Sequence, residues 1–376
     1  MTLKKLTISF ICLALSFTAV SYGGSSEMPA LKDVFAKDFL IGAALNDDVV
    51  SGRDPNAAAI VEKHFNTITA ENVMKWMHIH PEPDKYDFEA ADRFVEFGQK
   101  NKMFIIGHTL VWQYQTPAWV YKDNDGKQLG RDAMLARMKD HIATVVGRYK
   151  GKVKGWDVVN EALSDSGRLK VTKWTQTIGD DYIAKAFEYA HEADPNAELY
   201  YNDYTLEYAA KREGVVRLVK DLQSKGIRID GVGIQGHWNT REPSIKELEM
   251  FIDAVGALGV KVMVTELDVD ILPQATRQRG ADLNVRAELK NELNPYTEGL
   301  PDEMQQKLAN RYADLFAVFL KHKTNVGRIT FWGVYDKTSW LNYYPVAGRT
   351  NYPLLFDRDC QPKPAFFAVV KTAEGK

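Results

Sequence analysis

Residues 155–161 read Gly-Trp-Asp-Val-Val-Asn-Glu, and residues 260–266 read Val-Lys-Val-Met-Val-Thr-Glu. Both stretches are mainly apolar, have the length of one buried strand and end in a glutamate. A carboxylate at the end of a buried strand is a costly placement, because surroundings of low polarity disfavour the ionised form. Two such placements, at Glu161 and Glu266, predict a pair of carboxyl groups that meet in one cleft.

Six other runs have the same character, and segments with apolar residues at helical spacing separate them, as at Met134, Met138 and Ile142. Continuous apolar runs are typical of strands that are buried on both faces of a parallel sheet. The eight expected strands cover residues 39–44, 67–69, 103–108, 155–160, 198–202, 231–235, 260–266 and 328–332.

Strands that alternate with helices, with no linker rich in Pro, Gly or Ser, predict a single α/β domain. The expected fold is a (β/α)8 TIM barrel with its active site at the C-terminal ends of the strands. A doubly wound open sheet is the alternative. That fold would place a glycine-rich phosphate loop after the first strand, where Gly42 stands alone.

The N-terminus differs in composition from the rest of the chain. Lys4 and Lys5 precede an apolar run over residues 6–20, and small residues follow. This pattern predicts a signal peptide over residues 1–23 and a secreted or periplasmic protein whose folded domain covers residues 24–376. An uncleaved anchor is the alternative, although the run is short for a membrane span. After cleavage, Cys360 is the one remaining cysteine, which excludes an intrachain disulfide, and no stable membrane association is expected.

Polar and aromatic side chains gather where the expected strands end. In a parallel barrel these ends share one face, which is where barrel enzymes build their active sites. Two carboxyl groups held across a sugar bond are the machinery of glycoside hydrolysis. A formal net charge of −2 and the lack of a strongly basic face make nucleic acid an unexpected partner. The end residues are His108, Asn160, Glu161, Asn202, Asp203, Gln235, His237, Glu266, Asp268 and Trp332.

Seven motifs around these ends resemble those of glycoside hydrolase family 10, whose usual activity is endo-β-1,4-xylanase. They run in order through nearly the whole of residues 24–376, which the resemblance identifies as a catalytic barrel. The implied function is retaining hydrolysis of internal β-1,4-xylosidic bonds of xylan or xylo-oligosaccharides, through a covalent glycosyl-enzyme intermediate. The motifs are TAENVMKW (69–76), GHTLVWQYQTPAWV (107–120), WDVVNEAL (156–163), YYNDYTLE (200–207), GIQGHW (233–238), VTELDVD (264–270) and ITFWGVYDKTSWL (329–341).

The resemblance implies a role for each acidic residue of the pair. Glu161 is the expected general acid/base, and Asn160 the expected partner of the sugar 2-hydroxyl. Glu266 is the expected nucleophile, hydrogen-bonded by His237, which Asp268 holds in turn. A retaining mechanism places the two carboxyl groups about 5–5.5 Å apart. The structural alternative is that the glutamates form buried salt bridges with lysine or arginine.

The same resemblance implies a substrate-binding set of hydrogen-bonding and flat aromatic side chains. Amides, carboxylates and lysine can bond the hydroxyl groups of a sugar, and tryptophan offers an apolar platform for its C–H faces. The expected set is Glu71, Asn72, Lys75, His108, Trp112, Gln115, Tyr204, Gln235, Trp332 and Trp340.

Two residues depart from the family pattern. Gln113 is expected beside the site, and Tyr335 is expected to narrow the cleft or to add a platform. Segment 270–300 carries Arg277, Arg279, Arg286 and Lys290. It either walls the cleft, where it would meet acidic side groups of a decorated substrate, or forms an ordinary surface loop.

Two other functions remain open at this point. One is a related β-glycanase that acts on mixed glucan or aryl-cellobiosides, and the other is a carbohydrate-binding protein without catalysis. The second is less favoured, because a binding protein has no need of a matched acid and nucleophile. No metal or cofactor is expected, since glycoside hydrolysis requires neither, and the expected assembly is a monomer.

Overall fold

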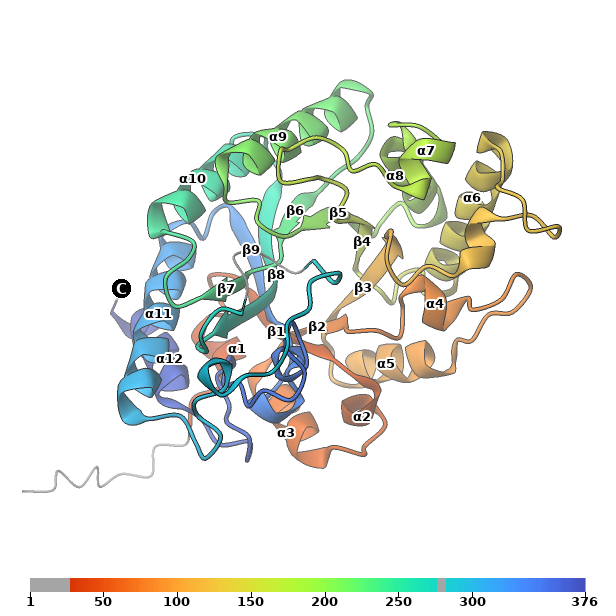
Figure 1. Cartoon of the computed structure of the whole chain (residues 1–376). Helices are drawn as coiled ribbons and strands as arrows, with labels where there is room; N and C mark the ends of the chain where they lie inside the picture. Colours follow the sequence, from red (N-terminus) through yellow and green to blue (C-terminus); the bar gives the residue numbers. More distant parts are fainter. Residues whose placement is uncertain (1–27, 276–281, 376) are drawn as a thin grey trace, which may run out of the picture.

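Eight parallel strands close into a barrel in the computed structural model, which describes residues 28–275 and 282–375 (Figure 1). Neighbouring strands pair in chain order, and the pairs β1–β9 and β6–β8 complete the ring. The predicted barrel is confirmed, and the open-sheet alternative is wrong. The barrel strands are β1 (Leu40–Leu45), β2 (Thr67–Ala70), β3 (Phe104–Val111), β4 (Gly155–Asn160), β5 (Glu198–Asp203), β6 (Gly231–Ile234), β8 (Lys261–Asp270) and β9 (Val326–Phe331).

Helices surround the barrel and bury their apolar faces against it (Figure 1). The longer ones are α3 (Pro55–His64), α5 (Glu89–Lys100), α6 (Arg131–Arg148), α8 (Tyr182–Ala193), α9 (Ala209–Ser224), α10 (Ile245–Gly256), α11 (Asp302–Lys321) and α12 (Pro364–Glu374). Shorter elements are α1 (Leu31–Val34), α2 (Asp47–Val50), α4 (Trp76–Ile79), α7 (Lys173–Thr177) and the 3-10 turns Ala118–Tyr121, Asn291–Leu293, Asp336–Thr338 and Trp340–Asn342. In the part of the chain that the structure describes, no helix is both long and apolar enough to cross a bilayer.

Most strand ends lie within one residue of the sequence prediction, and the ends of β3 and β8 lie well beyond it. β3 continues three residues beyond His108, and β8 continues four beyond Glu266, so both side chains lie within strands. The pairing register shifts at both places, between His108 and Val111 and between Val264 and Leu267. β6 ends one residue earlier than predicted, and a short further strand, β7 (His237–Asn239), pairs with the extension of β8. Strand length depends on such partners, which the local sequence does not reveal.

Side chains fill the barrel beneath its mouth. Ile106, Tyr200 and Met263 project from β3, β5 and β8 and form a buried cluster of their own. Close packing also requires a glycine at position 107, because a Cβ atom there would lie 2.1 Å from the Trp156 ring. The barrel is thus a packed support for the residues at its mouth, as is usual for this fold.

Two buried histidines, His80 at the end of α4 and His141 in α6, contact each other. His80 Nε2 is 3.0 Å from the Pro83 carbonyl oxygen, and His80 Nδ1 is 3.3 Å from His141 Nδ1. The carbonyl can only accept, so neutral His80 carries its proton on Nε2 and accepts from His141 at Nδ1. Burial lowers the pKa of both imidazoles, so the folded protein takes up protons at these two sites less readily than the unfolded chain does.

This pair predicts that the fold loses stability in acid. Because the folded-state pKa values are lowered, the unfolded chain binds protons first as the pH falls below about 6.5. The loss is at most about 1.6 kcal/mol between pH 6.5 and 5 for each histidine that stays neutral throughout. His141→Phe keeps a ring against Trp76, whose ring centroid lies 3.6 Å from that of His141. Chemical denaturation at several pH values should show a shallower acid slope for this variant.

The exposed His191 on α8 supplies the control for this measurement. His191→Phe should keep the pH dependence of the free energy of unfolding found for the unmodified protein. An acid slope for His141→Phe as steep as that of the control would contradict the assignment.

Candidate active site

Glu161 and Glu266 both lie at the mouth of the barrel. Glu161 directly follows β4 and is 3% exposed, and Glu266 lies within β8 and is 5% exposed. Among residues 28–275 and 282–375, neither carboxylate forms a salt bridge with lysine or arginine, so the salt-bridge alternative is wrong. Their surroundings differ, and the differences determine what each carboxyl group can do.

Glu266 lies among hydrogen-bond donors. His237 Nε2 is 3.1 Å from its Oε2, and Asn202 Nδ2 donates to its Oε1 at 2.8 Å. Burial alone would raise the pKa of Glu266. The bond from His237, the charges of His108 and His237, and the bond from Asn202 outweigh that effect and lower the pKa. Glu266 is therefore held as a carboxylate.

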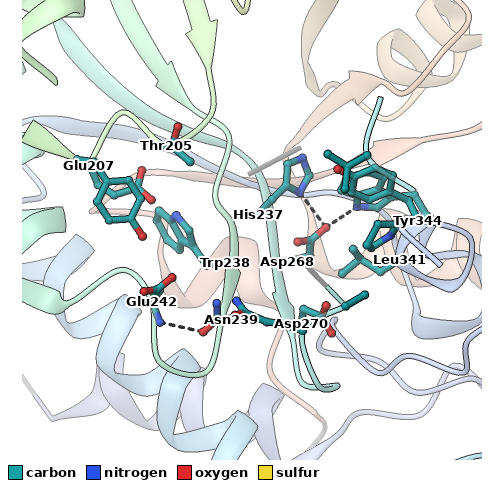
Figure 2. A pocket seen from close by; sticks show the side chains of 16 residues that line it. Thr205, Glu207, His237, Trp238, Asn239, Glu242, Asp268, Asp270, Leu341 and Tyr344 are labelled. Carbon is teal, nitrogen blue, oxygen red and sulfur yellow. Dashed lines mark hydrogen bonds and ion pairs between the residues drawn. The ribbon is translucent and has the colours of Figure 1, made fainter. Parts of the chain in front are cut away.

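His237 connects Glu266 to a second carboxylate, as predicted. Its Nδ1 is 3.0 Å from Asp268 Oδ2, and the same oxygen accepts from Trp340 Nε1 at 2.7 Å (Figure 2). Burial would lower the pKa of His237, but the charges and hydrogen bonds of Asp268 and Glu266 raise it to about 10. The imidazole is thus a cation at neutral pH. The pairing of His237 in β7 with Asp268 in β8 fixes this geometry.

Glu161 has a different environment, beginning with its backbone. Its φ angle is +59°, in the left-handed region that non-glycine residues seldom occupy, and its N–H donates to the Asn202 carbonyl at 2.8 Å. In a regular strand the side chains of residues 160 and 161 would point to opposite faces. The left-handed turn instead leaves the Asn160 amide 3.3 Å from Glu161 Oε1. Backbone conformations of this kind are often found at functional sites.

The Glu161 carboxyl group has one paired and one unpaired oxygen. Gln235 Nε2 donates to Oε1 at 2.9 Å, whereas Oε2 is buried without a hydrogen-bond partner in the described part of the chain. Burial raises the pKa of Glu161. The charges of Asp203 and Glu266 add to the rise, while Lys170 and the Gln235 bond oppose it. Glu161 is thereby set up to hold a proton under conditions in which Glu266 is ionised.

A chain of amide side chains joins the two carboxyl groups. Asn202 Nδ2 lies 2.8 Å from Glu266 Oε1 and 3.0 Å from Asn160 Oδ1, and Gln235 Nε2 lies 3.5 Å from Asn160 Oδ1. With the Asn160 amide turned over, its oxygen would instead accept from Trp112 Nε1 at 3.3 Å. In that orientation Asn160 no longer links the glutamates, whereas the bonds from Asn202 to Glu266 and from Gln235 to Glu161 are unchanged. The separation of about 5–5.5 Å between the carboxyl groups remains a prediction.

Lys75 lies among three of the predicted glutamates. Its ammonium group donates to Asn72 Oδ1 at 3.0 Å and lies 5.2 Å from the Trp112 ring centroid. Burial lowers the pKa of Lys75, and the negative charges of Glu266, Glu71 and Glu161 oppose that effect. Asn72 also donates to Glu71 at 3.2 Å. The turn after β2 therefore brings a compact polar group beside the two central carboxyl groups.

Aromatic side chains frame the same region. The Trp332 ring meets the rings of His108 and His237 edge-on, at centroid distances of 5.5 and 6.2 Å. Trp340 stacks on Tyr344 at 4.5 Å. Trp340 and Tyr344 line a pocket of about 100 Å³ together with Glu207, His237 and Asp268 (Figure 2). The side chains thus provide both flat apolar faces and converging polar groups.

The other predicted residues lie on neighbouring loops. The Tyr204 hydroxyl group accepts from Lys170 Nζ at 3.1 Å. Gln115 has a left-handed φ of +46°, and its carbonyl accepts from Met77 N at 2.9 Å. Gln113 lies beside the site as expected, because its amide donates to the Glu161 carbonyl at 3.3 Å.

Tyr335 does not lie where the sequence suggested. It is buried, and its hydroxyl group donates to Asp54 Oδ2 at 2.8 Å, so it packs toward the start of α3 and adds no platform to the site. In segment 270–300, Arg277 and Arg279 lie outside the described residues. Arg286 donates to two carbonyls of its own loop and lies 5.4 Å from the Tyr344 ring centroid.

Sequence reasoning missed three supporting residues. The sequence places Asn202 at a strand end but does not reveal its hydrogen bond to Glu266. Asp157 lies within β4, and its Oδ2 accepts a hydrogen bond from His108 Nδ1 at 2.9 Å. Trp174, outside every motif, donates to the Trp112 carbonyl at 3.2 Å. The pattern of polar residues at strand ends indicates that Asn202 lies near the site. No motif includes Trp174, so the sequence does not indicate its contact with Trp112.

Comparisons with known proteins agree with this geometry. The model of glycosyl hydrolase family 10 matches residues 30–372. Endo-1,4-beta-xylanase A of Xylanibacter ruminicola is 44% identical over 372 residues, which cover 99% of this chain and 100% of the relative. Beta-1,4-xylanase of Dictyoglomus thermophilum is 45% identical, over 92% of this chain and 91% of its own.

Solved structures show the same relationship. A family 10 endoxylanase retrieved from a sugarcane soil metagenome has a TM-score of 0.89 and 45% identity, covering 91% of this chain and 99% of its own. A xylanase from Paenibacillus barcinonensis, solved with a conduramine derivative, has a TM-score of 0.83 and 40% identity, with coverage of 92% and 99%. The chain belongs to glycosyl hydrolase family 10.

Proposed function

We propose that this protein is a retaining endo-β-1,4-xylanase that hydrolyses internal bonds of xylan or xylo-oligosaccharides. The observation that carries the mechanism is the opposed effect of the surroundings on two buried glutamates. The pKa of Glu266 is lowered by donors, whereas the pKa of Glu161 is raised by burial. Pairs of titratable groups with pKa values pushed apart are how one site supplies both an acid and an ionised nucleophile. The names of the relatives support xylan as the substrate.

In the first step, the Glu266 carboxylate attacks the anomeric carbon while Glu161 gives its proton to the departing glycosidic oxygen. A C–O bond to the enzyme forms as the bond to the leaving sugar breaks. The buried, unpaired Oε2 of Glu161 is the atom we assign to this proton transfer. His237 and Asn202 hold the attacking carboxylate in place.

In the second step, Glu161 is a carboxylate and accepts a proton from water, whose oxygen attacks the same carbon. The bond to Glu266 breaks, the configuration is retained, and Glu161 is protonated again. Asn160 lies between the two glutamates, which suits a bond to the 2-hydroxyl group that strengthens as positive charge develops on the sugar ring.

The remaining predicted residues fit roles in substrate binding. Glu71, Asn72 and Lys75 form a polar group that can bond sugar hydroxyls. Trp332 and Trp340 offer flat faces beside His237. We assign these residues, with His108, Trp112, Gln115, Tyr204 and Gln235, to the substrate cleft.

The substrate assignment is tested by comparing xylohexaose with cellohexaose. The two differ by a hydroxymethyl group on each sugar ring, and we expect kcat/KM for xylohexaose to be at least about 100-fold higher, since excluding an extra group from a packed pocket can contribute a few kcal/mol. Chromatography of early products should show internal cleavage. Equal turnover of both oligosaccharides would favour a broader β-glycanase, and release of single sugars from one end would contradict an endo mode.

The two glutamate roles predict different dependence on the leaving group. Glu266→Ala should lose about 10⁴-fold or more in kcat on every glycoside, because no nucleophile remains. Glu161→Gln should lose about 10³-fold on xylo-oligosaccharides but react with an aryl xylobioside at nearly the unmodified rate in the first step, since a phenolate of low pKa leaves without a proton. Stopped-flow release of the phenol measures that step.

The two variants serve as each other's control, because both change a buried carboxyl group in the same cleft. The assignment would be reversed if Glu266→Ala, rather than Glu161→Gln, kept the fast release of the activated phenol.

We also infer that the protein is exported after removal of residues 1–23. The support is the basic start and apolar run of the N-terminal segment, which lies outside the described residues. Mass spectrometry of the protein recovered from the periplasm or medium should give a mature N-terminus between residues 22 and 27. A full-length chain that stays in the membrane fraction would show the segment to be an anchor.

A further inference from the structure

The loop that follows Glu161 folds back toward it. Leu163 and Leu169 form an antiparallel bridge, and the backbone N–H of Lys170 donates to the Ala162 carbonyl at 2.8 Å. The Thr175 hydroxyl group donates to the Lys170 carbonyl at 3.0 Å. Because both the backbone N–H and the carbonyl of Lys170 are hydrogen-bonded, its backbone has a fixed position relative to Glu161.

The Lys170 side chain reaches a residue of the neighbouring strand end. Its ammonium group donates to the Tyr204 hydroxyl oxygen at 3.1 Å and lies 4.8 Å from the ring centroid. An ammonium group has no acceptor capacity, so the tyrosine oxygen must accept this bond. The proton of the Tyr204 hydroxyl group is thereby left free to be donated elsewhere.

A second ammonium group near the same ring is engaged differently. Lys211 Nζ lies 3.7 Å from the Tyr204 ring centroid and donates to Asp203 Oδ1 at 2.7 Å, as part of a fully buried ion pair. Lys170 has no such carboxylate partner in the described part of the chain, and it lies on an open groove that Gln113 and Lys173 also line. The positive charge of Lys170 is therefore less compensated than that of Lys211.

Lys170, Tyr204 and Glu161 share one electrostatic neighbourhood. After burial, the charge of Lys170 is the largest influence on the pKa of Glu161, and it acts to lower that pKa. The charge of Glu161 in turn contributes to the raised pKa of Tyr204. Other charged or titratable groups that act on or with Glu161 are Lys75, Tyr114, Asp203, Lys211, Glu266 and Tyr344.

We propose that Lys170 is a positioning residue for the hydrolysis: it holds the Tyr204 hydroxyl group as a donor into the cleft and stabilises the carboxylate that Glu161 becomes after giving its proton to the leaving oxygen. This inference rests on the proposed role of Glu161 as general acid. The proton moves from Glu161 to the glycosidic oxygen as the bond to the anomeric carbon breaks, and Lys170 exchanges no proton in the step.

The consequence is a specific change in pH dependence. Without Lys170, Glu161 keeps its proton to higher pH but is a weaker acid. Lys170→Met should move the basic limb of the pH profile of kcat/KM upward by about 0.5–1 pH unit. The maximum on xylohexaose should fall by about three- to tenfold, and the first step with an activated aryl xylobioside should change less than twofold, because that step needs little proton donation.

Two further variants separate this role from a structural one. Lys170→Arg keeps the charge and should leave the basic limb within about 0.2 pH unit of its original position. Lys173 lines the same groove, and its ammonium group lies 4.7 Å from the Tyr121 ring centroid. Lys173→Met should leave the pH profile of kcat/KM unchanged. Should Lys170→Met fail to fold, Lys170→Gln provides the same neutralisation with a polar side chain.

The outcomes are distinct. If the unmodified protein hydrolyses xylohexaose and the neutral variants keep its basic limb, the role of Lys170 is refuted while the proposed function stands. An equal shift in Lys170→Arg and Lys170→Met would likewise overturn it, since charge would then not be the cause. If the unmodified protein hydrolyses no xylo-oligosaccharide, the proposed function itself fails.

Discussion

The imidazolium of His237, held between the carboxylates of Glu266 and Asp268, is the interaction on which the site depends. An isolated carboxylate as deeply buried as Glu266 would tend to take up a proton. The His237 imidazolium, whose Nε2 lies 3.1 Å from Glu266 Oε2, opposes this protonation and fixes the direction of the attacking oxygen. Asp268 holds the imidazolium from its other nitrogen. The barrel provides this geometry through the extension of β8 beyond Glu266 and its pairing with β7.

The same cleft keeps Glu161 in the opposite condition. Its nearest polar contacts are amides, and one of its oxygens has no partner in the described residues, so burial dominates its pKa. The side chains of Asn160 and Asn202, which carry no charge, link the two regions by hydrogen bonds. Identical side chains can therefore take different roles, because a cation and donors bond Glu266 directly, whereas neutral amides bond Glu161 and burial dominates its pKa. Lys170 moderates that contrast from the loop after β4.

Much of this organisation could be predicted from the sequence. The barrel strands were recognisable because strands buried on both faces read as continuous apolar runs. Their polar ends placed Glu161, His237, Glu266 and Asp268 on one face. The strand ends at His108 and Glu266 were predicted too early, because extension beyond them depends on pairing with distant segments. The expected platform at Tyr335 was wrong, since its direction is set by Asp54 in another part of the chain. The bond from Lys170 to Tyr204 was not predictable, because 34 residues separate the two and only the folded loop brings them together.

The central claim is that one cleft keeps Glu161 protonated and Glu266 ionised at the same pH. A ¹³C-NMR titration of protein with carboxyl-labelled glutamate measures this directly, with the two resonances assigned by their loss in Glu161→Gln and Glu266→Gln. The resonance of Glu266 should titrate at a pH below that of an ordinary glutamate, and the resonance of Glu161 above it. The reverse order, or one common midpoint, would contradict the account.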